Sequence, residues 1–96
     1  MTIDRPDLLV AHLFREEAGR MVSRLTHVLG ARHLDLAEDA VQDALMRALH
    51  TWPLQGVPEQ PAAWLFTAAR NRALDKLRRD QWFVEREAVI TSALRA

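Results

Sequence analysis

The sequence contains no cysteine and no tyrosine, and only three of its 96 residues are glycine. Without cysteine, the chain has no disulfide bridges, no thiolate catalysis and no cysteine-based zinc site. The absence of any run of about 18 apolar residues argues against a membrane-spanning segment. Residues 1–7 also lack the basic and then apolar order of a secretion signal. We therefore expect a cytoplasmic protein that does not associate with a membrane.

The residue patterns of common enzymes are missing as well. There is no glycine-rich phosphate-binding loop and no nucleophile elbow. The four histidines, His12, His27, His33 and His50, include no pair spaced by four residues, so a metal site is not expected. Adjacent carboxylates such as Glu16 and Glu17 point about 100° apart on a helix and do not share a proton. We expect no catalysis, no cofactor and no metal ion.

The residues that dominate the chain favour helices. Alanine, leucine and arginine are frequent, whereas the alternation of β-branched residues that is typical of strands is scarce. At 96 residues, 49% hydrophobic and 27% charged, the chain is long enough for one small domain with a modest core. The sequence therefore predicts an all-α domain.

Two helices are predicted in residues 1–53. The first begins near Pro6, with Asp4 as its N-cap, and ends at Gly30, where a glycine suits a helix C-terminus. Its predicted buried stripe contains Leu9, Leu13, Met21, Leu25 and Val28. The second helix begins at Asp35, which forms a capping-box pattern with Glu38, and ends near Trp52 and Pro53. Its predicted apolar residues are Leu36, Ala40, Val41, Ala44, Leu45, Ala48 and Leu49.

A loop and a third helix are predicted in the remainder. Residues 52–60 hold Pro53, Gly56 and Pro58, which mark the loop, and Pro61 opens the third helix. The predicted core face of this helix consists of Phe66, Ala69, Ala73 and Leu77. Because residues 62–96 contain no glycine or proline, the helix either continues past Arg79 or breaks near residues 80–83. The apolar residues within 84–96 leave open a fourth, C-terminal helix.

Charge is unevenly distributed along the chain. The formal net charge is zero, but residues 1–59 carry nine acidic and six basic residues, whereas residues 60–96 carry four and seven. An acidic block comprises Asp35, Glu38, Asp39 and Asp43. Compensation of the helix dipole explains its first three members, but Asp43 lies farther into the helix. The alternative is a docking surface for a basic partner.

The third predicted helix carries a basic block: Arg70, Arg72, Lys76, Arg78 and Arg79, with Asp75 among them. Opposite its core face lie Trp64, Thr67, Asn71, Asp75 and Arg78. Such a block is either a solvated charged face or a surface for single-stranded nucleic acid. An aromatic ring, an amide and several arginines would supply base stacking, base-edge hydrogen bonds and phosphate neutralisation.

These segments, in this order, resemble region 2 of the extracytoplasmic-function class of the sigma-70 family of bacterial transcription initiation factors. The resemblance covers residues 9–79, and two motifs carry most of it: LAEDAVQDALMRAL at 36–49 and PAAWLFTAARNRALDKLRR at 61–79. The segment FREEAGR at 14–20 looks like the subgroup whose members carry a large helical C-terminal extension. The resemblance implies a three-helix sigma region 2 bundle and a sigma factor rather than an enzyme.

The resemblance also implies two binding surfaces. The second helix matches the segment that docks on the β′ clamp helices of core RNA polymerase, and its candidate contacts are Glu38, Asp39, Gln42, Asp43 and Arg47. The loop and third helix match the element that captures an unstacked base of the promoter −10 element from the non-template strand. The candidate DNA contacts are Trp64, Arg70, Asn71, Arg72, Asp75, Lys76, Arg78 and Arg79. Asn71 matches a base-reading position, the cations match positions on backbone phosphates, and Trp64 serves either the core or DNA.

Two departures from the family pattern shape the remaining expectations. Many members have a short helix before the one that begins here near Pro6. A whole factor also has a second domain with a helix-turn-helix, and the residues after Arg79 cannot form such a domain. We therefore expect an isolated or unusually short region 2 domain over residues 1–83, with residues 84–96 as a linker or additional helix. The competing interpretation is a helical interaction module that binds an acidic partner, such as an anti-sigma factor, without DNA. An anti-sigma factor or a C-terminal domain of the same protein remain further candidate partners.

Overall fold

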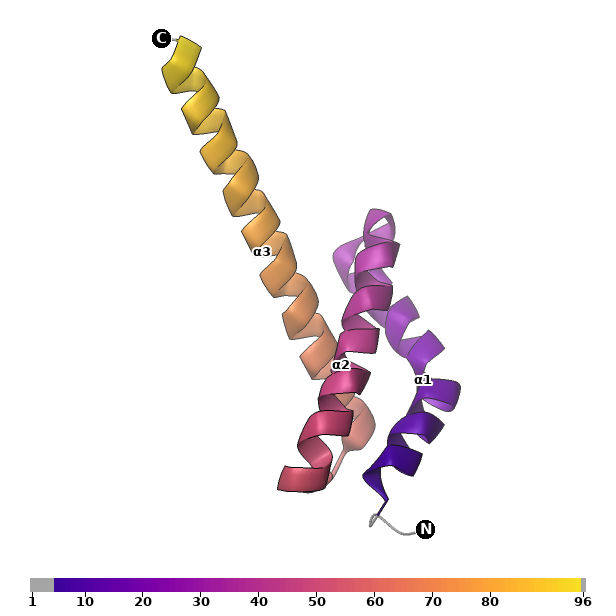
Figure 1. Cartoon of the computed structure of the whole chain (residues 1–96). Helices are drawn as coiled ribbons and strands as arrows, with labels where there is room; N and C mark the ends of the chain where they lie inside the picture. Colours follow the sequence, from indigo (N-terminus) through magenta and orange to yellow (C-terminus); the bar gives the residue numbers. More distant parts are fainter. Residues whose placement is uncertain (1–4, 96) are drawn as a thin grey trace.

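The computed structural model describes residues 5–95, and that part of the chain contains helices and no strand. The elements are α1 (Pro6–Leu29), the short 3-10 helix η1 (Ala31–His33), α2 (Leu34–Gln55) and α3 (Pro61–Arg95). Helix α2 lies between α1 and the first half of α3, whereas the C-terminal half of α3 extends away from both (Figure 1). The prediction of an all-α domain built from three main helices is confirmed.

Both ends of α1 lie where proline and glycine predict them. Pro6 opens the helix, and its missing N–H is no loss in a first turn. Arg5 occupies the N-cap position without a side-chain cap, and the predicted cap, Asp4, lies outside the described residues. Gly30 ends α1 at φ 105°, and its N–H donates to the Thr26 carbonyl oxygen at 2.8 Å. That backbone conformation favours glycine, and it allows the chain to reverse direction here.

The predictions for the ends of α2 are wrong in detail. The helix begins at Leu34 after the 3-10 turn, so Asp35 lies in its first turn and forms no capping box. At the other end, α2 continues through Pro53 to Gln55. A proline in a last turn removes one hydrogen bond without stopping the helix, and Gly56, at φ 91°, ends it instead. The loop is therefore residues 56–60, shorter than the predicted 52–60.

The core is formed by one face of each helix. Its buried residues are Val10, Leu13, Met21 and Leu25 of α1, then Ala37, Ala40, Val41, Ala44, Leu45, Ala48 and Trp52 of α2, then Leu65, Ala69 and Ala73 of α3. Helix α2 contributes half of them because it is central. Its four buried alanines, like the two of α3, have small side chains that allow the helix axes to lie close together.

Some predicted core residues lie at its edge or outside it. Val28 follows the spacing of α1 but occupies its last turn, and 59% of it is exposed. Leu9 is only partly buried, and Val10 packs in the core instead. On α3 the buried residues are Leu65, Ala69 and Ala73, of which Leu65 was not predicted, while Phe66 and Leu77 are half-buried. The predicted face was thus rotated slightly from the actual one.

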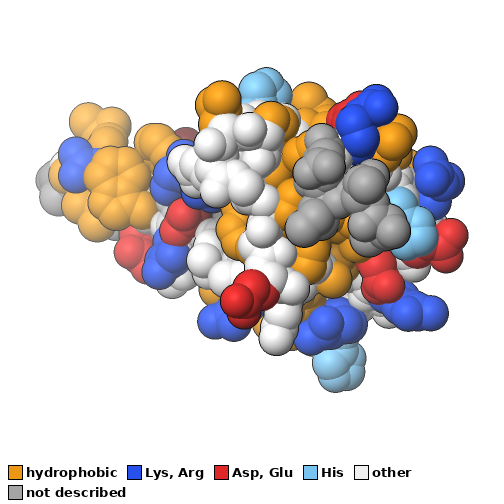
Figure 2. Space-filling view, turned by 90° about the horizontal axis from the view of Figure 1, so that it is seen from below, with side chains coloured by type: hydrophobic (Ala, Val, Ile, Leu, Met, Phe, Trp, Pro, Cys, Tyr) orange, Lys and Arg blue, Asp and Glu red, His pale blue; other side chains and the backbone are white. Residues whose placement is uncertain are grey.

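Helix α3 runs without a break to Arg95, so residues 84–95 form no separate fourth helix. Pairs of side chains four residues apart support it past the bundle, including Lys76 with Asp80 at 3.5 Å and Gln81 with Glu85 at 3.2 Å. Every described residue after Leu77 is exposed. Figure 2 shows hydrophobic side chains on the surface of this protruding segment, among charged ones.

Within residues 5–95, no helix is both long and apolar enough to cross a membrane. Nor do any three histidine, aspartate or glutamate side chains in the described part gather as ligands for a metal ion.

Candidate functional site

The residues predicted to contact polymerase all lie on the exposed face of α2. They are Glu38, Asp39, Gln42, Asp43 and Arg47. This face has two edges. Gln42 borders α1, whereas Asp43 and Arg47 border α3. The predicted set therefore spans two different inter-helix surfaces.

An apolar groove of about 530 Å³ lies between α1 and α2. Its lining consists of Val10, Ala11, Phe14, Leu45, Met46 and Leu49, with Asp7, Arg15 and Gln42 at its polar positions. More than half of Phe14 and of Met46 is exposed. This groove was not predicted from the sequence, although two large apolar residues beside Gln42 and off the buried stripes were a usable signal. Such a groove fits a helix of a partner.

The polar positions of this groove carry charges of both signs, from Asp7 and Arg15. The Arg5 side chain donates hydrogen bonds to the Asp7 carboxylate at 3.3 and 3.4 Å, which lowers the pKa of Asp7. Both side chains are solvent-exposed, so the pair adds little to stability. It does keep Asp7 ionised at the edge of the groove.

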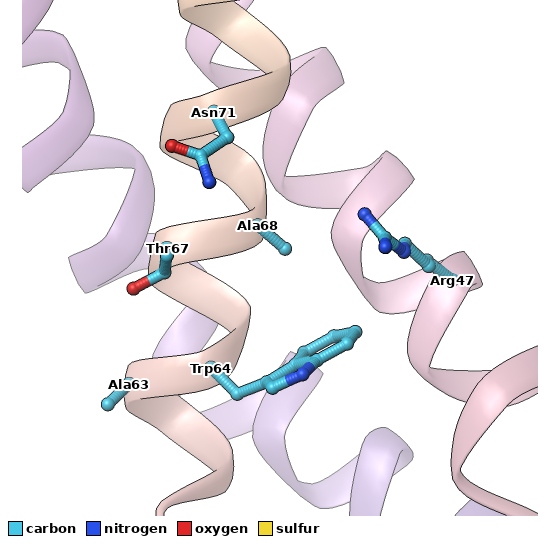
Figure 3. A pocket seen from close by; sticks show the side chains of 6 residues that line it. All are labelled: Arg47, Ala63, Trp64, Thr67, Ala68 and Asn71. Carbon is cyan, nitrogen blue, oxygen red and sulfur yellow. The ribbon is translucent and has the colours of Figure 1, made fainter. Parts of the chain in front are cut away.

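A second pocket, of about 340 Å³, lies between α2 and α3. It is lined by Ala63, Trp64, Thr67, Ala68 and Asn71 of α3 and by Arg47 of α2. Figure 3 shows Trp64 and Arg47 extending towards each other across the space between the helices, with the Asn71 amide two turns further along α3. The α3 residues fall within about 140° of the helix circumference and so share one side of the helix. Residues 56–60 contribute nothing to this lining.

Trp64 contributes to the core and to this pocket at once. Its ring packs edge-on against the buried Trp52, with 5.3 Å between ring centroids and 67° between planes. It also faces the guanidinium of Arg47, which lies 5.8 Å from the ring centroid. The sequence left Trp64 open between the core and DNA, and the structure places it in contact with both the core and the pocket.

An ion pair joins the two predicted binding sets. Arg72 Nε donates to Asp43 Oδ2 at 3.0 Å across the contact between α3 and α2. About half of each side chain is exposed, so the pair adds little to folding stability. Its effect is to hold Arg72 against α2, beside the pocket.

The other predicted DNA residues do not form one patch. Asp75 and Arg78 pair with each other on the face that carries Asn71. Arg70 and Arg72, two positions apart, are about 200° apart around the helix, so Arg72 faces α2 through Asp43 and Arg70 does not. Within residues 5–95, Arg70 and Arg79 form no ion pair.

The family model for sigma-70 region 2 matches residues 13–83. The chain belongs to the sigma-70 region 2 family. The predicted family is therefore confirmed, and it is a family of transcription initiation factors rather than of enzymes. The extracytoplasmic-function class and the subgroup with a C-terminal extension remain predictions.

This region 2 domain also matches a protein of Rhizobium meliloti (strain 1021) that is described as uncharacterized. The two are 48% identical over 64 residues, which are 62% of this chain and 15% of that relative. The chain thus spans a small part of that protein's length. No solved structure matches the chain significantly.

Proposed function

We propose that this region 2 domain binds core RNA polymerase through the exposed face of α2 and captures a base of the promoter −10 non-template strand in the α2–α3 pocket. The observation that carries the proposal is the convergence of an indole, an amide and a guanidinium in one pocket. Binding there would hold the −10 element open for transcription to start.

The polymerase half of the proposal is supported by α2. Glu38 and Asp39 are exposed on it, and the apolar groove lies alongside Gln42. Acidic side chains favour a basic partner surface and increase the rate of encounter, while burial of Phe14 and Met46 would supply affinity. The clamp helices of the β′ subunit are the partner that the family suggests.

The DNA half is supported by the chemistry of the pocket. Removing a base from the stack costs a few kcal/mol. Stacking on an aromatic side chain returns about 1–3 kcal/mol per base, and the Asn71 amide offers both a donor and an acceptor to a base edge. Arg78 and Arg79 lie further along α3, where the neighbouring phosphates would run.

The net charge of zero explains why both halves are needed. Non-specific attraction to DNA depends on excess positive charge, which the domain as a whole lacks. A polymerase that already holds the domain near the promoter removes that requirement. We therefore expect tight DNA binding only when the polymerase contact is made.

Fluorescence anisotropy tests the proposal with short single-stranded oligonucleotides randomised over the −10 segment, with and without a β′ clamp-helix fragment. Sequence-selective binding that strengthens with the fragment supports both halves. Binding of the fragment without any sequence preference would leave only the docking half. Failure to bind either would favour the competing function, an interaction module for an acidic partner.

A further inference from the structure

We infer that Arg47 belongs to the nucleic-acid pocket and not to the polymerase-binding face on which the family resemblance places it. The inference rests on the proposed function, and it identifies Arg47 as the residue that forms the α2 side of the pocket. Arg47 follows Glu38 by nine residues, which is about 180° around the helix. It therefore lies on the α3 edge of α2, away from the edge that borders α1.

The surroundings of Arg47 are those of a ligand-binding cation. Its side chain is exposed, and within residues 5–95 it pairs with no carboxylate. The nearest acid on the same helix edge, Asp43, is engaged by Arg72 at 3.0 Å. Arg47 instead faces the Trp64 ring at 5.8 Å.

The chemistry of a guanidinium suits this position. It is planar, stacks on rings and bases, and offers five donors to a phosphate or to a base edge. Trp64 supplies a stacking surface, Asn71 lies at the far end, and Arg47 closes the side opposite α3. The ligand is an unstacked nucleotide whose base lies near Trp64 and whose phosphate or base edge is contacted by Arg47.

Variants of two α2 residues, Arg47 on the α3 edge and Asp39 between the two edges, test this assignment. Arg47→Ala should weaken binding of the −10 oligonucleotide to the preformed complex with the clamp fragment by about tenfold, and lower the salt slope by about one. Its affinity for the fragment should not change. Asp39→Ala should lower the affinity for the fragment and leave oligonucleotide binding by the complex unchanged. Arg47→Lys should restore the salt slope but not the full affinity for the oligonucleotide, because an ammonium group does not stack.

The outcomes separate this inference from the proposed function. If Arg47→Ala lowers fragment affinity and leaves oligonucleotide binding by the complex unchanged, Arg47 is a polymerase contact and the inference is wrong. If the unmodified domain binds neither fragment nor oligonucleotide, the proposed function fails and the inference fails with it. Circular dichroism checks that each variant remains folded.

A separate observation concerns the protruding half of α3. One face of it carries an apolar stripe, formed by Trp82, Phe83, Val89, Ile90, Ala93 and Leu94. More than half of each large member is exposed. Arg86 lies within the stripe, with its guanidinium 4.8 Å from the Trp82 ring centroid. We propose that a second copy of this chain covers this stripe in antiparallel orientation.

Side-chain size and charge favour a second copy of the chain as the partner. The stripe has aromatic rings at one end and Ala93 and Leu94 at the other, so antiparallel pairing places large residues opposite smaller ones. Glu87 borders the stripe beside Arg86. In a two-fold arrangement each Arg86 comes within reach of Glu87 of the second copy, which makes the contact twice. Antiparallel pairing also keeps the two bundles at opposite ends.

Analytical ultracentrifugation over a range of concentrations tests this second proposal. The chain should form a concentration-dependent dimer, which Ile90→Asp abolishes and Val84→Asp, on the opposite face, leaves intact. Glu87→Arg should weaken the dimer, and the double exchange Arg86→Glu with Glu87→Arg should restore it. The proposal would be overturned if the chain stayed monomeric at every soluble concentration, or if Ile90→Asp did not weaken the dimer. The occupant of the stripe would then be a different protein.

Discussion

At the scale of single residues, Trp64 is the side chain on which folding and binding depend together. Its contact with the buried Trp52 connects it to the core, and its other contact is with Arg47. Any substitution at this position therefore has two effects, on the free energy of unfolding and on ligand affinity. Replacing Trp64 by a residue that preserves only one of these contacts separates the effect on stability from the effect on affinity.

Trp64→Phe should retain the edge contact with Trp52 and part of the stacking surface, whereas Trp64→Ala should lose both. We expect Trp64→Ala to reduce the free energy of unfolding by about 1–3 kcal/mol and to weaken oligonucleotide binding by a similar amount. Thermal melting and anisotropy measure the two effects. A loss of stability with unchanged oligonucleotide affinity would assign Trp64 to the core alone.

Asn71 and Arg78 are expected to differ in the kind of effect they have. Asn71→Ala should relax the preference for one −10 base by about 1–3 kcal/mol, because an amide reads base edges. Arg78→Ala should weaken all single-stranded sequences similarly and flatten the salt dependence, because phosphate contacts carry no sequence information. Anisotropy with single-base variants at several salt concentrations distinguishes them. An unchanged preference in the Asn71 variant would remove its base-reading role.

At the scale of elements, α2 organises the molecule. One face fills the core with alanines, its α1 edge borders the apolar groove and its α3 edge closes the pocket. The acidic side chains that suggest docking lie between these edges. Because Asp43 is paired with Arg72, a substitution there would alter both predicted surfaces at once. Asp39 is the better test of docking.

Asp39→Arg should abolish association with the β′ clamp fragment while leaving the helix content unchanged, because the side chain is exposed and reverses sign towards a basic partner. Glu59→Arg in the loop makes the same charge change away from α2 and serves as the control. Titration calorimetry with the fragment measures both. Association retained by Asp39→Arg would contradict the assignment of this face.

The helices were largely predictable, and the site was predictable only in part. Pro6, Gly30 and Pro61 set boundaries by local backbone chemistry, which a sequence displays directly. Pro53 misled because it removes one hydrogen bond to the preceding turn without ending the helix, which Gly56 ends instead. The pairing of Arg47 with Trp64 and of Asp43 with Arg72 depends on which helices are neighbours. Helical periodicity assigns residues to a face but does not say which element lies opposite.

At the scale of the whole molecule, the described residues in the protruding part of α3 do not pack in the core of the bundle. All described residues after Leu77 are exposed, and the family match ends at residue 83. We propose residues 1–83 as the folding domain. Removal of residues 84–96 should change the free energy of unfolding of the monomer by less than about 1 kcal/mol, since no core contact is lost. Urea unfolding at low protein concentration measures this, and a larger loss would show that the tail belongs to the domain.

The central claim is that the α2–α3 pocket holds one unstacked −10 base. The most direct test is an abasic scan, in which each base of the −10 oligonucleotide is removed in turn and binding to the complex with the clamp fragment is measured for the wild-type domain and for Asn71→Ala. The account predicts one position whose removal costs the wild type about 1–3 kcal/mol and costs the variant less, because the variant has already lost the Asn71 hydrogen bonds to that base. Equal losses in both proteins at every position would contradict it.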